Sequence, residues 1–117
     1  MNQISPISYL NIEDLNQHVN SSTPFVLIFL SEWCPACQEY KAIAEFFAEK
    51  IEKKISTYVL KPENVDDNIW KLLELNKIDV IPYTLFFLGK TTLAEVPGAM
   101  RFYDYETAIK TIYKTFL

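Results

Sequence analysis

The ten residues 31–40, SEWCPACQEY, contain both cysteines of this chain, Cys34 and Cys37, separated by two residues. Two thiols at this spacing could form a reversible disulfide, supply half of a metal site, or be two unrelated side chains. A disulfide between them would close a loop too short to stabilise the fold much by restricting the unfolded chain. If the two sulfurs pair, redox chemistry is therefore a better reason than stability.

Metal binding and cysteine–histidine catalysis are poorly supported by the other residues. A zinc site would need Cys34, Cys37, the single histidine His18 and a fourth ligand, and this spacing matches no common zinc pattern. His18 falls on a different predicted helix from the cysteines, so nothing in the sequence brings it to Cys34 as a catalytic base. We expect no metal and no bound cofactor, and we expect His18 to be a solvated helix residue.

Length and composition limit the class of protein. The chain has 117 residues, half of them hydrophobic and 15% aromatic, which predicts a single folded domain over residues 1–117. A net charge of −4 without a basic run argues against nucleic-acid binding. No apolar run approaches the ~18 residues of a membrane span, and the N-terminus lacks the features of a secretory signal. We expect a cytoplasmic monomer, or an exported protein if an upstream signal has been removed.

The cysteines lie between a predicted strand and a predicted helix. The continuous apolar run at residues 25–30 fits a central strand that is covered on both faces. From Cys34 to about Lys53 the pattern is helical, with one apolar stripe and charged residues around it. The stripe consists of Tyr40, Ile43, Ala44, Phe47 and Ile51.

Shorter patterns complete an alternation of strands and helices. Further strands are predicted at residues 7–10, 55–60, 83–88 and 91–96, with a loop at residues 62–66. Three more helices are predicted, capped by Asn11, by Asp66 or Asp67, and by Asp104. The order β-α-β-α-β-α-β-β-α predicts an α/β fold in which a mixed five-stranded sheet is flanked by four helices.

This arrangement gives the two cysteines different roles. Cys34 falls at the start of the helix, where free backbone N–H groups and the positive end of the helix dipole favour a thiolate. Pro35 suits the first helical turn, since its missing donor would be unpaired there. Cys37 lies one turn further on, close enough to attack a mixed disulfide at Cys34. Cys34 is thus the predicted nucleophile and Cys37 the predicted resolving thiol.

At this point the chain resembles the thioredoxin family over nearly its whole length. FVLIFLSEWCPAC resembles the second strand and active-site turn of that family, VIPYTLFFLGK its strand that begins at a cis-proline, and EVPGA the start of its last helix. The resemblance implies a thioredoxin fold with a cis Pro82 that faces the cysteines and a neighbouring backbone that pairs with extended substrate. The substrate-binding residues expected from it are Trp33, Pro35, Ala36, Ile81, Pro82 and Tyr83.

The chain also departs from the family pattern. Typical thioredoxins have Gly-Pro between the cysteines, where this chain has Pro35-Ala36. The buried aspartate that usually precedes the first cysteine by six residues is replaced by Ile28, and its accompanying lysine aligns with Val59. Glu32 is near in sequence but need not point inward. We therefore expect slower or differently tuned disulfide exchange than in a general thioredoxin.

The resemblance implies a thiol–disulfide oxidoreductase that exchanges disulfides with protein substrates through Cys34 and Cys37, as a reductant regenerated by an external reductase or thiol system. Two alternatives stay open. One is a thioredoxin-like interaction module with weak catalysis, which the apolar residues Ile28 and Val59 would explain. The other is a disulfide oxidase or isomerase that assists exported, bacteriocin-like peptides, since the direction of exchange depends on relative reduction potentials.

Overall fold

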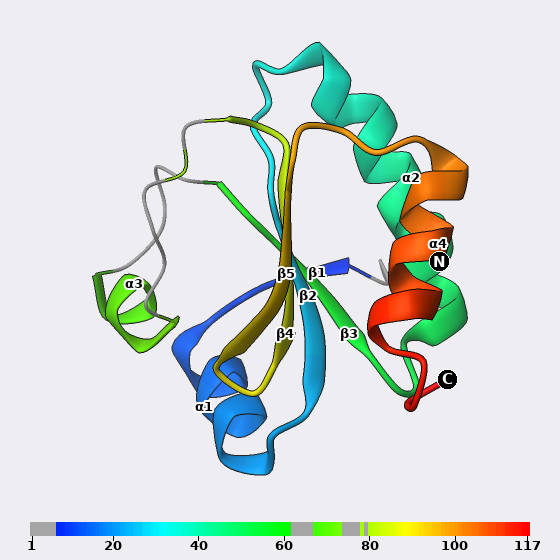
Figure 1. Cartoon of the computed structure of the whole chain (residues 1–117). Helices are drawn as coiled ribbons and strands as arrows, with labels where there is room; N and C mark the ends of the chain where they lie inside the picture. The colour runs from blue at the N-terminus through cyan, green and yellow to red at the C-terminus, as the bar shows by residue number, and fades with distance from the viewer. Residues whose placement is uncertain (1–6, 62–66, 74–77, 79) are drawn as a thin grey trace, which may run out of the picture.

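A mixed sheet of five strands forms the centre of the molecule (Figure 1). The computed structural model describes residues 7–61, 67–73, 78 and 80–117, so the loop predicted at residues 62–66 lies outside the described residues. Along the described chain the elements are β1 (Ile7–Tyr9), α1 (Ile12–Ser21), β2 (Pro24–Phe29), α2 (Pro35–Ile51), β3 (Ser56–Leu60), α3 (Asp67–Leu73), β4 (Tyr83–Leu88), β5 (Thr91–Pro97) and α4 (Phe102–Ile112).

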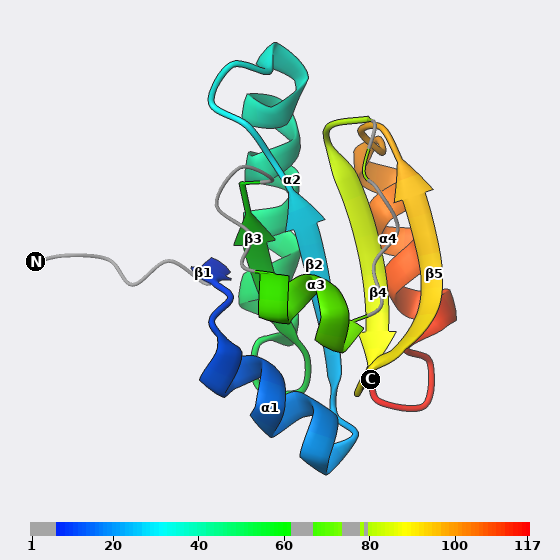
Figure 2. The same ribbon diagram turned by 90° about the vertical axis from the view of Figure 1, so that its left-hand side faces the viewer.

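The strands are ordered β1-β3-β2-β4-β5 across the sheet. β3 pairs in parallel with β1 and β2, while β4 pairs antiparallel with β2 and β5. The helices α2 and α4 cover one face of the sheet and α1 and α3 cover the other, which faces the viewer in Figure 2. The predicted α/β fold with a mixed five-stranded sheet and four flanking helices is confirmed for the described chain.

The central strand β2 supplies both hydrophobic cores. All six of its residues are buried. Val26 and Ile28 face α2 and α4, whereas Phe25, Leu27 and Phe29 face α1 and α3. Because consecutive side chains of a strand point to opposite faces, a continuous apolar run can fill two cores at once.

The predicted N-cap residue is correct for α1 and wrong for α4. Asn11 caps α1, and its side chain accepts the backbone N–H of Asp14 at 2.8 Å. The prediction that Asp104 caps the last helix was wrong, because α4 begins at Phe102 and Arg101 occupies the cap position without a side-chain hydrogen bond. The Phe102 ring packs 4.7 Å from that of Phe47, so aromatic packing onto α2 draws the helix start toward it.

His18 is not the solvated residue that the sequence predicted. Its ring is half-buried, with Nδ1 2.6 Å from the Thr23 hydroxyl and Nε2 2.8 Å from the Tyr58 hydroxyl. It also stacks on Phe25, with ring centroids 4.6 Å apart. Both Phe25 and Tyr58 lie on strands beneath α1. The prediction of a solvated His18 was wrong because the sequence pattern of the helix alone does not show which side chains of the sheet it will contact.

Two buried tyrosines of the C-terminal segment differ in their hydrogen bonds. The Tyr113 hydroxyl, just beyond α4, donates toward the carbonyls of Phe25 and Phe87, each at 2.8 Å, and so ties this end of the chain to β2 and β4. Tyr105 is as fully buried, but its hydroxyl has no partner among the described residues. A buried hydroxyl stabilises the fold only where it replaces the hydrogen bonds that water supplied.

This difference predicts that replacing each tyrosine by phenylalanine will affect stability unequally. Tyr113→Phe should lower the free energy of unfolding by about 1–3 kcal/mol, because it leaves two carbonyls of the sheet without this donor. Tyr105→Phe should change it by less than about 0.5 kcal/mol or raise it slightly, since no bond is lost. Urea unfolding of both variants measures this, and equal losses would contradict the assignment.

His18 predicts a pH dependence of stability. Burial lowers the pKa of His18 below its ordinary value of 6.5, and the charge of Asp14 opposes this only in part. The unfolded chain therefore binds a proton at His18 before the folded chain does, so stability is lost as pH falls through about 6.5. Urea unfolding at about pH 7.5 and about pH 5.5 should show this loss, and His18→Gln should reduce it. NMR titration of the single histidine giving a pKa above 6.5 would contradict the prediction.

Candidate active site

Cys34 is placed by the turn that joins β2 to α2. It is the N-cap residue of α2, with extended backbone, and Pro35 follows it inside the first helical turn. The turn is held by two hydrogen bonds to Ser31, whose carbonyl accepts the N–H of Cys34 at 3.3 Å and whose hydroxyl accepts the N–H of Trp33 at 3.2 Å. Cys34 is therefore positioned by the end of a buried strand on one side and by a proline-started helix on the other.

The sulfur of Cys34 occupies the position in which a capping oxygen normally sits. The backbone N–H of Cys37 donates to it at 3.2 Å, as a donor of the helix start does toward a capping side chain, and also donates to the Cys34 carbonyl at 3.1 Å. On its other side the sulfur lies 3.8 Å from the carbonyl oxygen of Ile81. Both cysteines are free thiols, and Cys34 as a residue is half-buried, so it is held in place while part of it stays in contact with solvent.

Cys37 lies in a different environment. It faces the core and is only 2% exposed. Burial raises the pKa of Cys37 to about 11, with smaller contributions from Cys34, while a backbone contact of Ser31 opposes the rise. Cys37 is thus protonated at neutral pH. The roles of Cys34 as nucleophile and Cys37 as resolving thiol stay predictions, but this difference in exposure suits them.

A second segment, 47 residues further along the chain, completes the site. The Ile81–Pro82 peptide bond is cis, and the carbonyl of the buried Pro82 accepts the N–H of Gly98 at 2.8 Å. Gly98 has a φ of +81°, a conformation that favours glycine. Because the Ile81 carbonyl lies 3.8 Å from the Cys34 sulfur, the structure brings these two predicted site residues together.

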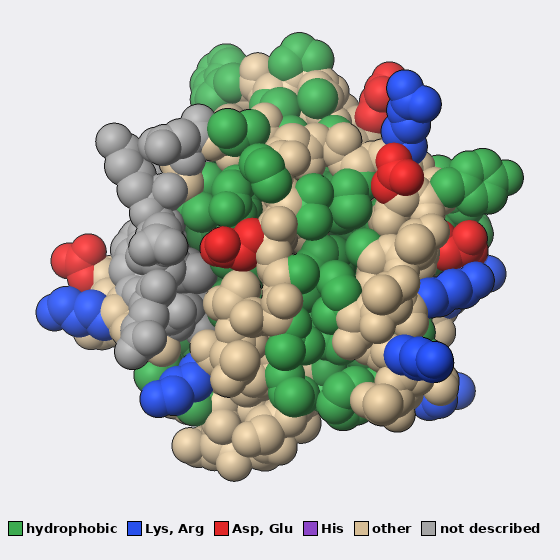
Figure 3. Space-filling view, in the orientation of Figure 1, with side chains coloured by type: hydrophobic (Ala, Val, Ile, Leu, Met, Phe, Trp, Pro, Cys, Tyr) green, Lys and Arg blue, Asp and Glu red, His purple; other side chains and the backbone are tan. Residues whose placement is uncertain are grey.

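The other predicted substrate-binding residues do not all lie near Cys34. Trp33, Pro35 and Ala36 are exposed around Cys34, and Figure 3 shows hydrophobic side chains gathered over the beginning of α2. Trp33 is 89% exposed, so its side chain is not part of the core. Tyr83 is half-buried and packs against the core on the other face of the sheet, away from the Cys34 cluster. Their contact with substrate stays a prediction.

The interior behind the cysteines is apolar where the family usually carries a charged pair. Ile28 and Val59 are register partners on β2 and β3, and both are buried. The nearby hydroxyls of Tyr40 and Thr84 are 2.6 Å apart and bond to each other. Because the side chains of Ile28 and Val59 are apolar, neither can exchange a proton with Cys37.

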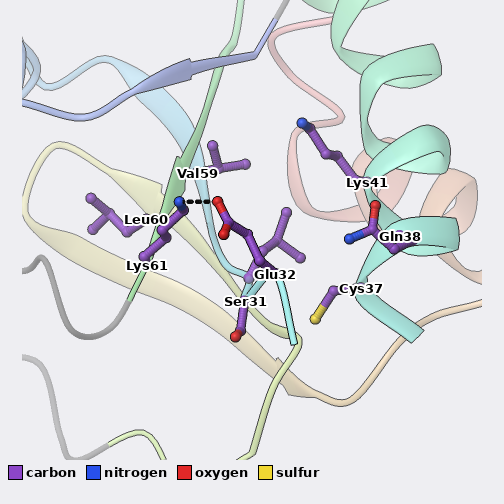
Figure 4. Close-up of a pocket in the computed structure, with 9 residues that line it drawn as sticks. Ser31, Glu32, Cys37, Gln38, Lys41, Val59, Leu60 and Lys61 are labelled. Carbon is purple, nitrogen blue, oxygen red and sulfur yellow. Dashed lines mark hydrogen bonds and ion pairs between the residues drawn. The ribbon is translucent and has the colours of Figure 1, made fainter. Parts of the chain in front are cut away.

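A cavity of about 200 Å³ lies beside Cys37 (Figure 4). At its edge the carboxylate of Glu32 pairs with the ammonium group of Lys61. The Lys61 hydrogen bond and charge lower the pKa of Glu32 below its ordinary value. The cavity is lined by Leu30, Ser31, Glu32, Cys37, Gln38, Lys41, Val59, Leu60 and Lys61.

Sequence reasoning noted Glu32 only as a neighbour of Cys34 and missed Lys61. A signal for the pair did exist. Phe29 and Leu60 are opposite each other in the parallel pair β2 and β3, so the residues that follow the two strands emerge at the same edge of the sheet. Opposite charges just beyond the ends of parallel neighbours are placed to meet.

The described residues form neither a metal-binding cluster nor a membrane-spanning helix. Within the described ranges, no cluster of three or more His, Cys, Asp and Glu side chains is arranged to hold a metal ion. His18 lies on α1, across the sheet from α2, so the structure does not bring it to the cysteines. No helix in the described part of the chain is both long and apolar enough to span a bilayer.

Comparisons with known proteins agree on one family. The sequence model of the family described as Thioredoxin matches residues 6–111. Similar solved structures include oxidised thioredoxin O2 from Arabidopsis thaliana, with 22% identity, coverage of 93% of this chain and 96% of that one, and a TM-score of 0.70. A thioredoxin from Malassezia sympodialis has 17% identity, coverage of 90% and 88%, and a TM-score of 0.70. A mutant thioredoxin from Halobacterium salinarum has 15% identity, coverage of 95% and 96%, and a TM-score of 0.69. Comparison with curated proteins gave no match.

The unequal exposure of the thiols predicts unequal reactivity. At about pH 8 a thiol with a pKa near 11 is ionised in about one molecule in a thousand, and burial blocks its access to reagents. Iodoacetamide should therefore modify Cys34 first, and Cys37 at least about 100-fold more slowly. Mass spectrometry of the wild type and of Cys34→Ser measures the two rates. Modification of Cys37 in the folded Cys34→Ser variant as fast as Cys34 in the wild type would contradict the assigned burial.

Proposed function

The chain belongs to the thioredoxin family, and from that premise we propose that it is a thiol–disulfide oxidoreductase that reduces disulfides in protein substrates. Family membership supports the general chemistry, and the choice of reduction over oxidation is our inference. The most direct support is the placement of Cys34, a half-buried residue whose sulfur caps α2 and lies beside the Ile81 carbonyl. Behind it Cys37 is buried one helical turn away.

The reaction follows from this arrangement in two exchanges. The Cys34 thiolate attacks one sulfur of the substrate disulfide, a mixed disulfide forms, and the other substrate sulfur leaves as a thiolate. Cys37 then loses its proton and attacks the Cys34 sulfur, which breaks the mixed disulfide and releases the second substrate thiolate. Two electrons pass from the protein dithiol to the substrate. The resulting Cys34–Cys37 disulfide needs an external reductase or small thiol for its reduction.

The surface around Cys34 suits a protein substrate. Trp33, Pro35 and Ala36 present an apolar rim that is open to solvent, and the Ile81 carbonyl lies at the sulfur itself. A peptide in extended conformation could therefore bury apolar side chains against the rim and bring its disulfide to Cys34. Reduction of protein disulfides fits a reducing compartment such as the cytoplasm, and we include that location in the proposal.

A second candidate function is a thioredoxin-like interaction module with weak catalysis. The observation that favours it is the apolar pair Ile28 and Val59 behind a buried Cys37. If nothing accepts the proton of Cys37, mixed disulfides at Cys34 would resolve slowly. Turnover measured beside a known thioredoxin separates the two candidates, because a module would form the disulfide but turn over negligibly.

Single-cysteine variants test the proposed division of roles. Cys34→Ser should reduce the rate of insulin disulfide reduction to background, because no exposed thiol remains to attack. Cys37→Ser should also stop turnover, but it should accumulate a mixed disulfide with the substrate, since attack at Cys34 proceeds and resolution does not.

Turbidity of reduced insulin measures the first result, and non-reducing gels with mass spectrometry measure the second. Urea unfolding of both variants checks that they are folded. Full activity in Cys34→Ser, or mixed disulfides that form through Cys37 in preference to Cys34, would show that the mechanism is wrong.

A further inference from the structure

We propose that Glu32 accepts the proton of Cys37, through water in the cavity between them, when Cys37 resolves a mixed disulfide at Cys34. This inference rests on the proposed function, because it assigns the proton acceptor of its second step. It gives a role to Glu32, which in the sequence simply precedes Cys34 by two residues. It also gives a role to the cavity beside Cys37 that the first exchange does not use.

The need for an acceptor comes from the burial of Cys37. Its side chain is 2% exposed, and its pKa is raised to about 11. At about pH 7 only about one thiol in ten thousand would be ionised at equilibrium with bulk water. Because the thiolate is the attacking species, each resolution step requires that this proton leave the interior.

The cavity supplies a route for that proton. Cys37 and Ser31 lie at one end of it, and the side chains of Glu32 and Gln38 approach it from opposite sides in Figure 4. Its volume of about 200 Å³ exceeds what a few water molecules need, and its lining includes a hydroxyl, an amide and charged groups. Water in such a cavity can bridge a thiol and a carboxylate that do not touch.

Glu32 is suited to receive a proton and to pass it on. Lys61 holds the pKa of Glu32 below its ordinary value of 4.5, so the carboxylate is ionised at neutral pH. Its side chain is 71% exposed, so a proton taken from the cavity side can be released to bulk solvent. The pairing with Lys61 keeps the carboxylate at the edge of the cavity.

The other described residues around Cys37 are poor acceptors. Ile28 and Val59 carry no polar group, and the hydroxyl of Tyr40 is bonded to that of Thr84. The remaining charged groups on the cavity wall are Lys41 and Lys61, whose ammonium groups donate hydrogen bonds and accept none. Among the described residues that line the cavity, Glu32 is the carboxylate.

The step balances in protons and electrons. The Cys37 proton moves to a cavity water while a proton of that water moves to Glu32. The thiolate forms a bond to the Cys34 sulfur, the bond from Cys34 to the substrate sulfur breaks, and that sulfur leaves with the electron pair. Glu32 then releases its proton to solvent. The electrons come from the protein dithiol, so no further oxidant or reductant is required.

A purely electrostatic role for Glu32 makes the opposite prediction. A negative charge near Cys37 disfavours a second negative charge there, so its removal would make the Cys37 thiolate easier to form. Glu32→Gln would then speed the resolution step. If Glu32 accepts the proton, the same substitution slows that step. The sign of the change therefore separates the two roles.

The test is a stopped-flow reaction of the reduced protein with the aromatic disulfide dithiobis(nitrobenzoate), which releases a coloured thiolate at each exchange. The first phase reports attack by Cys34, and the second reports resolution by Cys37. In the wild type the second phase should be independent of pH between about pH 6 and about pH 8, since the carboxylate stays ionised. In Glu32→Gln it should be slower by on the order of 10- to 100-fold at about pH 7 and should rise about tenfold per pH unit.

Two further variants control this result. Glu39→Gln removes the same charge from an exposed position near the start of α2 that does not line the cavity, and it should leave both phases unchanged. Glu32→Asp keeps a carboxylate, so it should keep a pH-independent second phase. Urea unfolding of each variant confirms that the fold is retained.

Three results would overturn the proposal. They are a second phase in Glu32→Gln as fast as or faster than in the wild type, a wild-type second phase that rises with pH, and an equal loss in Glu39→Gln. Failure of the proposed function looks different. In that case the wild type would show no first phase, or a first phase without any second one, and the assignment of Glu32 would fall with its premise.

Discussion

The burial of β2 on both faces is the constraint on which the rest of the structure depends. Its alternating side chains fill the two cores, and its pairing with β3 and β4 sets the register of the sheet. A strand held this firmly delivers the turn that follows it to a defined place. That turn carries Cys34 to the start of α2, beside the Ile81 backbone that precedes β4.

The chemistry of the pair comes from a difference in position between two identical groups. Cys34 is held by hydrogen bonds of the helix start and is only partly buried, whereas Cys37, one turn away, is turned into the core. The same apolar packing that stabilises the fold therefore makes one thiol accessible and makes the other difficult to ionise. Any disulfide exchange that uses both thiols must therefore overcome the free-energy cost of ionising Cys37.

With the apolar residues Ile28 and Val59 in the interior, the charged groups near the cysteines lie at the edge of the sheet. A charged pair in the interior would lose its hydration, and this costs free energy unless the two groups are well aligned and fully hydrogen-bonded. Glu32 and Lys61 instead meet just beyond the ends of β2 and β3, where Glu32 is exposed to solvent. Near the site the interior contains the bonded hydroxyls of Tyr40 and Thr84. The protein thus combines a largely apolar core beneath the cysteines with a polar cavity beside them.

The sequence by itself determined the element order, the central strand, the close spacing of the two cysteines and the position of Cys34 at a helix start, because these follow from periodicity, proline placement and spacing along the chain. It also pointed to the segment at Pro82. Only the tertiary structure decided what depends on contacts between distant residues. The hydrogen bonds of His18, the early start of α4, the placement of Tyr83 on the opposite face and the pairing of Glu32 with Lys61 all depend on partners that local pattern does not specify.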